Sequence, residues 1–246
     1  MTVWVGLDLG QANDWTAISV VDVGGPPDAV KRQAQGLEVK PIYRVRTLVR
    51  AALGTPYPVI VKQVNDWLAK LKPRSPSLVI DATGVGRPVV DMFDAYGVHS
   101  MAVTITGGDH TNQDGRHIRV PKKDLVGTCT KLFQTERLRI QESLPLRDTF
   151  VRELNSFRMK QSAAGHISYD AREGEHDDLV LSVGLAVWAA ERDCNDSWHT
   201  DPLDPSLSHG DRALLLGRRA DERVRRRKLQ AQRDPDGVMG ELEQLD

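Results

Sequence analysis

The sequence has few cysteines, almost no net charge and no long apolar run, and each absence excludes a class of protein. Its 246 residues include 2 cysteines, and Cys129 and Cys194 have the spacing of neither a metal site nor a disulfide framework. No apolar stretch approaches the about 18–20 residues that cross a membrane. The formal net charge of −1 means that affinity for a polyanion has to come from a local basic surface. The sequence therefore predicts a reduced, cytoplasmic protein that makes no contact with a membrane.

Two motifs are also missing. A GxxxxGK[ST] phosphate loop does not occur, which excludes a nucleotide-driven motor of that kind. The first residues, "MTVWVGLDLG", enter a β-strand pattern at once, so we expect no signal peptide. A chain of this length is long enough for one or two domains with a sizeable core.

What the sequence does contain is a pattern of strands followed by alternating helices and strands. The β-rich runs 3–10 and 15–23 are separated by a short polar connection, which predicts an antiparallel hairpin, and the run 42–50 alternates apolar and basic residues as a half-exposed strand would. The next stretch reads helix, strand, helix, strand, which is typical of parallel strands joined by crossovers. We expect these four elements within 57–71, 77–84, 86–97 and 98–106, with the strand in 77–84 ending on Asp81. The pattern predicts an α/β fold with a central mixed β-sheet, an antiparallel first hairpin and then parallel strands, flanked by helices.

The C-terminal half predicts further helices and then a change in composition. A polar loop is expected at 107–117, a short strand at 138–140, and helices at 120–138, 145–157 and 177–192. After residue 192 the chain is turn-rich and lacks periodicity, and residues 212–233 hold nine Arg and Lys against two acids. We therefore expect one domain over 1–192 and a charged tail over 193–246 that is partly helical or disordered.

Four aspartates stand where this fold can bring them together. Asp8 lies in the first strand, and Asp81 ends an apolar strand. Ligands bind at the carboxyl ends of the strands of an α/β sheet. Asp177 and Asp178 head the last predicted helix, where two adjacent acids need a positive partner. That partner can be the helix end, an arginine or a metal ion.

Clustered carboxylates predict a metal centre because they cannot all ionise cheaply without a cation. Oxygen ligands with few histidines suit Mg²⁺ or Mn²⁺. Two such ions about 3.5–4 Å apart cleave phosphodiesters, one activating water and the other stabilising the leaving oxygen. The sequence therefore predicts a two-metal site held by Asp8, Asp81 and at least one of Asp177 and Asp178.

Each acid also has a purely structural explanation. Asp8 can be a solvated or turn-forming acid near a hairpin, and Asp81 can cap the helix that follows it. An acid in the first turn of a helix is stabilised by the helix dipole, so we expect one of Asp177 and Asp178 to bind metal and the other to cap the helix or to hold a second ion. Helical phase does not separate these two. We expect His176 to lie beside the ligands or on the surface rather than to bind metal itself.

A basic segment precedes the late acids, Asp177 and Asp178. Residues 116–160 hold eleven Arg and Lys and five acids. Lys122 and Lys123 begin a predicted helix beside the polar loop, and Arg116 and Arg119 come just before them. Contact with DNA phosphates explains these four residues as well as a solvated helix face does.

Four segments together carry a resemblance to a known family. In chain order they read "GLDLGQANDWTAI", "VIDATGVGRPVVDMF", "IRVPKKDLV" and "EHDDLVLSVGLAVWAA". The ordered set resembles the nuclease domain of bacteriophage large terminase subunits over residues 3–192. This resemblance implies an RNase H-like, resolvase-like fold and metal-dependent cleavage of double-stranded DNA during genome packaging in the cytoplasm of a bacterial host. It places the family's metal-binding acids at Asp8, Asp81 and either Asp177 or Asp178.

The sequence departs from the family in one respect, which keeps other functions open. A complete large terminase carries an N-terminal packaging ATPase, and the phosphate loop of such an ATPase is missing. The expected partners are double-stranded DNA and, from the resemblance, a packaging ATPase, a small terminase and a portal. The alternatives are a Holliday-junction resolvase of the same fold, a catalytically degenerate DNA-binding adaptor and, from "GLDLG", an actin-like or sugar-kinase ATPase.

Overall fold

The first of two compact units contains the whole central β-sheet. The computed structural model describes residues 1–10, 14–71, 76–84, 86–161, 167–170 and 176–198. The chain divides into Met1–Glu191 and Arg192–Asp246. Most of the predicted tail, including the basic run 212–233, lies outside the described residues.

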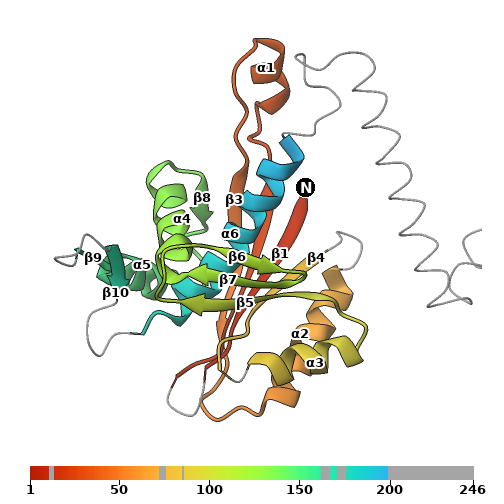
Figure 1. The fold of residues 1–246 in the computed structure, drawn as a ribbon. Helices are drawn as coiled ribbons and strands as arrows, with labels where there is room; N and C mark the ends of the chain where they lie inside the picture. The colour runs from red at the N-terminus through yellow and green to blue at the C-terminus, as the bar shows by residue number, and fades with distance from the viewer. Residues whose placement is uncertain (11–13, 72–75, 85, 162–166, 171–175, 199–246) are drawn as a thin grey trace, which may run out of the picture. The chain divides into compact units, whose positions relative to one another are not determined.

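The central sheet has 8 strands in the order β6-β7-β5-β4-β1-β2-β3-β8 (Figure 1). Its strands are β1 (Thr2–Asp8), β2 (Ala17–Gly24), β3 (Ile42–Arg50), β4 (Pro76–Asp81), β5 (Ser100–Thr106), β6 (Asn112–Asp114), β7 (His117–Pro121) and β8 (Leu138–Ile140). β1, β2 and β3 pair antiparallel, while β4 is parallel to both β1 and β5, and β5 to β7. The predicted mixed sheet, with its antiparallel hairpin and later parallel strands, is therefore confirmed. A separate antiparallel pair consists of β9 (Arg158–Gln161) and β10 (Ile167–Asp170).

Helices connect and flank these strands. They are α1 (Ala29–Ala34), α2 (Tyr57–Leu71), α3 (Gly86–Ala95), α4 (Lys122–Gln134), α5 (Arg147–Ser156) and α6 (Asp178–Trp198). The short helix α1 lies in the connection between β2 and β3, while α2 and α3 lie side by side (Figure 1). Pro88 falls in the first turn of α3, where its missing N–H costs no helical hydrogen bond.

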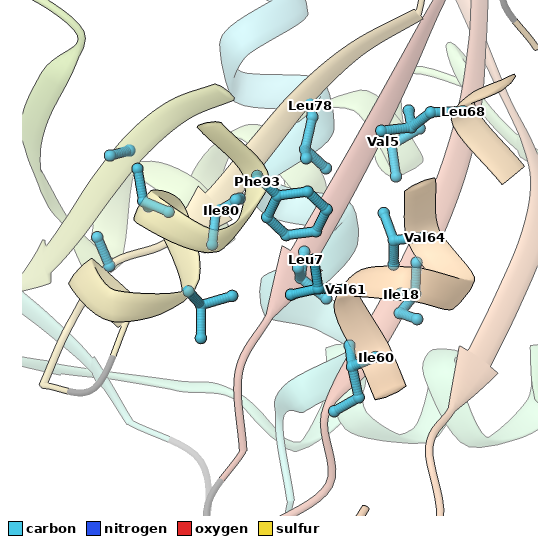
Figure 2. Close-up of a cluster of buried hydrophobic side chains, with 14 of the residues drawn as sticks. Val5, Leu7, Ile18, Ile60, Val61, Val64, Leu68, Leu78, Ile80 and Phe93 are labelled. Atoms are coloured by element: carbon cyan, nitrogen blue, oxygen red, sulfur yellow. The ribbon is translucent and has the colours of Figure 1, made fainter. Parts of the chain in front are cut away.

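One face of the sheet forms a hydrophobic core with α2 and α3. Figure 2 shows Val61 and Val64 of α2 and Phe93 of α3 directed at apolar side chains of the strands, among them Leu7 and Ile80. All five of these residues are buried. Because successive side chains of a strand point to opposite faces, this core fixes which residues of β1 and β4 face the other side.

The other face of β1 lies against α6. A Cβ placed on Gly6 would be 1.9 Å from the backbone oxygen of Ser182, so the helix backbone passes directly over this glycine. The α6 residues from Leu179 to Val187 are all buried, which explains why the segment reads as a continuous apolar run instead of an amphipathic one.

Three local predictions are wrong. The expected polar loop at 107–117 contains β6, a fully exposed edge strand that has no apolar alternation to reveal it. The helix expected from residue 120 begins only at Lys122, because residues 117–121 form β7. The last helix continues past residue 192 to Trp198, and no glycine or proline follows residue 192 before Pro202.

Candidate active site

Asp8 and Asp81 lie next to each other at the carboxyl ends of two adjacent parallel strands. β1 and β4 are in register up to Leu7 and Ile80, so the residues that follow each of these end their strands side by side. Leu7 and Ile80 face the core with α2 and α3, and the pleat therefore directs both aspartates to the opposite face. Asp8 is 8% exposed and Asp81 is 9% exposed. Strand register thus brings together two predicted site residues that are far apart in the sequence.

Asp81 is held in place by its own turn. Its Oδ1 accepts hydrogen bonds from the backbone N–H of Thr83 at 2.8 Å and from the Thr83 hydroxyl at 2.5 Å. The same hydroxyl oxygen accepts the backbone N–H of Ile105 at 2.9 Å, which ties the turn to β5. Gly86 packs against the Asp81 backbone so closely that a Cβ there would lie 2.3 Å from its carbonyl oxygen. The carboxylate is therefore preorganised through one of its two oxygens.

Both carboxyl groups hold protons more tightly than usual. Burial raises the pKa of Asp8 well above its ordinary value, and the negative charges of Asp81, Asp177 and Asp178 raise it further. Burial also raises the pKa of Asp81, against the opposing effect of the hydrogen bonds from Thr83. The Asp8 and Asp81 carboxyl groups are close enough to share a hydrogen bond when one is protonated. A bound cation would offset both the cost of burying the charged carboxylates and the repulsion between them.

The two late acids have different positive partners. The Asp177 Oδ2 is 2.5 Å from the Lys122 ammonium, and the Asp177 backbone oxygen accepts the N–H of Leu181 at the start of α6. Asp178 instead receives two hydrogen bonds from the Arg50 guanidinium, at 2.6 and 3.1 Å. Both Asp178 oxygens bind Arg50, whereas Asp177 contacts Lys122 through Oδ2, so Asp177 is the better placed of the two to complete the site.

Arg50 joins Asp178 to a second buried acid, Glu153 of α5. One Arg50 nitrogen is hydrogen-bonded to Glu153 Oε1, and Glu153 Oε2 accepts the backbone N–H groups of Leu179 and Val180 at 3.1 and 3.2 Å. Burial and the Asp178 charge raise the pKa of Glu153 to about 8 although Arg50 and both N–H groups oppose the rise. Glu153 therefore caps the first turn of α6 from another helix.

Neither Arg50 nor Glu153 was among the site residues predicted from sequence. Arg50 closes an alternating strand and reads as one more solvated basic residue. Glu153 lies 26 residues before the N–H group of Leu179 that it caps, so no local capping pattern reveals it. The available signal for such a partner is the presence of two adjacent acids, Asp177 and Asp178. Two such acids at the head of a buried helix need a cation nearby, but the sequence does not show which residue supplies it.

His176 lies at the edge of this cluster. Its ring packs edge-on against Trp15, with ring centroids 4.4 Å apart, and the Arg50 guanidinium also stacks on Trp15, 4.5 Å from the ring centroid. The His176 Nδ1 is 3.8 Å from Asp14 Oδ1. His176 is exposed, and its role beside the acids stays a prediction.

The predicted DNA-binding residues are distributed over β7 and the start of α4. Lys122 contacts Asp177, Lys123 contacts Asp109, and Arg116, just before β7, forms a two-pronged pair with Asp94. The side chain of Arg119 is exposed. Three of the four predicted phosphate-binding residues thus already have acidic partners, and their binding role stays a prediction.

Two of the three expected carboxylate ligands, Asp8 and Asp81, are arranged to bind a hard divalent cation, and the third ligand is not in place. Asp8 and Asp81 offer buried, adjacent carboxylate oxygens, which are the ligands Mg²⁺ and Mn²⁺ prefer. Across the described residues, no three His, Cys, Asp or Glu side chains are grouped closely enough to hold a metal ion together. The candidates for the third ligand, Asp177 and Asp178, are drawn toward Lys122 and Arg50.

Comparison with known proteins identifies the fold. No family model and no curated protein matches the sequence. Solved structures do match. The cobalt-bound large terminase nuclease of thermophilic phage G20c is 21% identical, with a TM-score of 0.53 over 76% of this chain and 80% of that one. Its magnesium-bound form is 22% identical, with a TM-score of 0.50 over the same shares.

A RuvC structure from Thermus thermophilus is more distant. It is 12% identical and covers 77% of this chain and 93% of that one, with a TM-score of 0.36. The two G20c matches show that the fold of this chain is RNase H-like and resembles that of phage large terminase nuclease domains, as predicted from the sequence. Among the described residues, no helix is both long and apolar enough to cross a membrane.

Proposed function

We propose that this protein is a divalent-metal-dependent endonuclease that cleaves double-stranded DNA. The observation that carries the proposal is the pair of buried carboxylates, Asp8 and Asp81, at the ends of adjacent parallel strands in an RNase H-like sheet. The G20c terminase nucleases of this fold were solved with bound cobalt and magnesium. A terminase-type role in phage genome packaging, with a packaging ATPase, a small terminase and a portal as partners in a bacterial host, is the specific form of the proposal.

The site residues have distinct roles in this proposal. Asp8 and Asp81 hold the metal, and Asp177 completes the ligand set. Asp178 is held by Arg50, which also contacts Glu153, so Asp178 positions the start of α6 rather than binding metal. When bound, one or two Mg²⁺ or Mn²⁺ ions supply activation of water and stabilisation of the leaving oxygen. The protein itself supplies a preorganised, poorly hydrated carboxylate site in which charge interactions are strong.

Substrate binding is assigned to the basic residues next to the acids. Lys122, Lys123, Arg116 and Arg119 lie on or beside β7 and in the first turn of α4, and β7 is parallel to β5, which is parallel to β4. Lys122 and Lys123 therefore leave the sheet at the same edge as Asp81. Phosphate contacts from this edge position the duplex without reading its sequence. The basic run within 212–233 is a further tether for DNA.

Plasmid nicking tests the function. The full chain should relax and linearise supercoiled plasmid with Mg²⁺ or Mn²⁺ and not in EDTA. Asp8→Asn and Asp81→Asn should abolish cutting, whereas Asp66→Asn, in an exposed pair with Lys62 on α2, should not. Titration calorimetry should detect Mn²⁺ binding to the wild type that Asp8→Asn removes. Metal-independent cutting, or cutting that survives both site substitutions, would refute the proposal. Cleavage of a four-way junction in preference to linear duplex would identify a resolvase instead.

A further inference from the structure

Lys122 emerges from the sheet at the edge where the acids lie. It follows directly on β7, which ends at Pro121, and it is the first residue of α4. The parallel ladders from β7 through β5 and β4 to β1 bring the carboxyl ends of these strands to one edge. Asp8 and Asp81 end two of the same strands. Topology therefore places a lysine ammonium beside the proposed metal centre.

The ammonium of Lys122 contacts a carboxylate oxygen of Asp177, the acid proposed as the third metal ligand. Its Nζ lies 2.5 Å from Asp177 Oδ2 and 5.8 Å from the centroid of the Phe157 ring. The side chain is 31% exposed, so this pair is partly withdrawn from solvent. Asp177 in turn is near enough to Asp8 to raise its pKa. One positive charge thus already neutralises part of the acid cluster.

The position of Lys122 is unfavourable for α4 on its own. A cation in the first turn of a helix opposes the helix dipole, and the acid that Lys122 contacts does not belong to its own helix, since Asp177 comes from the segment before α6. Lys123 has the same unfavourable position and pairs with Asp109 in the loop before β6. These two neighbouring lysines differ in which acid they neutralise, and Asp177 is the one of these two acids that belongs to the proposed site.

We propose that Lys122 is a resident counter-cation of Asp177 that competes with divalent metal for this carboxylate and leaves it when metal binds. This inference rests on the proposed function, since it assumes metal at Asp8 and Asp81. A lysine ammonium is a compact point charge on a flexible stem, so it can leave a carboxylate without movement of the backbone. The Phe157 ring lies 5.8 Å from the same Nζ and gives the ammonium a favourable neighbour that is not a carboxylate. By competing, Lys122 lowers the affinity of the site for metal. When no metal is bound, its positive charge neutralises part of the acid cluster.

Metal titration without DNA tests the competition. Mn²⁺ and Mg²⁺ are titrated calorimetrically into the full-length wild type, Lys122→Met and the matched control Lys123→Met. Removal of a positive charge a few ångströms from the metal should raise the affinity of Lys122→Met roughly tenfold, while Lys123→Met stays at the wild-type value. Lys122→Arg keeps the charge and should also stay near the wild type. Mg²⁺ should raise the Tm of Lys122→Met by more than it raises that of the wild type.

The outcomes separate this inference from the proposed function. Equal or weaker metal affinity in Lys122→Met, with metal still bound at Asp8, would overturn the competition and leave the nuclease proposal intact. An equal gain in Lys123→Met would overturn it as well, because the effect would then be general electrostatics. No metal binding to the wild type would end both proposals. If Lys122→Met does not fold, Lys122→Gln, which is polar and uncharged, takes its place in the same titration.

Discussion

Gly6 of β1 lies directly beneath the backbone carbonyl of Ser182 in α6. A Cβ at this position would be 1.9 Å from that oxygen and 2.9 Å from its carbon, closer than any side chain can approach. The contact sets the distance between β1 and α6, and α6 begins at Asp178, four residues before Ser182. The glycine therefore determines how near the late acids come to Asp8, which is two residues farther along β1.

Gly6→Ala should separate α6 from the sheet. Overpacking of this kind costs about 1–3 kcal/mol, and the backbone contact leaves no flexible atom that could move aside. Urea unfolding followed by circular dichroism measures the decrease in stability. Gly24→Ala is the matched control, because the three atoms nearest to a Cβ at this position of β2 all belong to the flexible side chain of Met1. Equal stability of the two variants would show that α6 is not held at this distance.

The parts of the fold that could be predicted are those marked by a local pattern of apolar and polar residues. Alternation and short connections predicted the first hairpin, and the change from helix to strand after residue 57 predicted the parallel strands. These patterns also placed Asp81 at the end of its strand, which is the feature that led to the site. β6 escaped detection because its three residues are all exposed, so no burial pattern marks it.

The partners of the acids could not be predicted from sequence. Asp178 is bound by Arg50, 128 residues away, and Arg50 is bound to Glu153 over 103 residues. Such contacts depend on the arrangement of β3, α5 and α6 in space. An ion pair between residues so far apart in the chain leaves no periodic pattern in the sequence. The sequence indicated that Asp177 and Asp178 need positive partners and did not indicate which ones.

Arg50→Met should destabilise the protein strongly. The side chains of Arg50, Glu153 and Asp178 are 16%, 6% and 6% exposed, so removal of the guanidinium leaves Asp178 buried without its cation. Breaking one partner out of such a buried pair costs about 3 kcal/mol or more. Chemical denaturation at neutral pH measures this cost. Arg32→Met, which removes an exposed pair with Asp28, should cost less than about 0.5 kcal/mol, and a similar small cost at Arg50 would contradict the structural role of this buried ion pair.

Asp8→Asn should stabilise the metal-free protein at neutral pH. The folded-state pKa of Asp8 is raised, chiefly by burial, so the folded protein binds this proton more tightly than the unfolded chain. The wild type therefore loses stability as the pH rises from the unfolded value of about 3.9 through the folded pKa, and the loss is complete above it. Asparagine has no charge to bury and escapes this loss.

Thermal unfolding in EDTA between pH 4 and pH 8 checks the sign. The advantage of Asp8→Asn over the wild type should be absent at the acidic end and grow as the pH increases. Added Mg²⁺ should reverse the order by stabilising only the wild type. An Asp8→Asn protein that is less stable than the wild type at pH 8 without metal would assign Asp8 a structural role.

Lys122→Ala combined with Lys123→Ala should weaken duplex binding about equally for unrelated sequences. Each lysine that binds a phosphate releases a counterion, so the dependence of log K on log salt should flatten by about one unit for each phosphate-binding lysine removed. Fluorescence anisotropy in EDTA over a range of KCl concentrations measures the slope without cleavage. Lys62→Ala, which removes an exposed lysine paired with Asp66 on α2, serves as the control for the removal of a single positive charge. If affinity and slope stay at wild-type values, the two lysines serve only Asp177 and Asp109, and the DNA-binding surface has to be sought at Arg119 and in the basic run of 212–233.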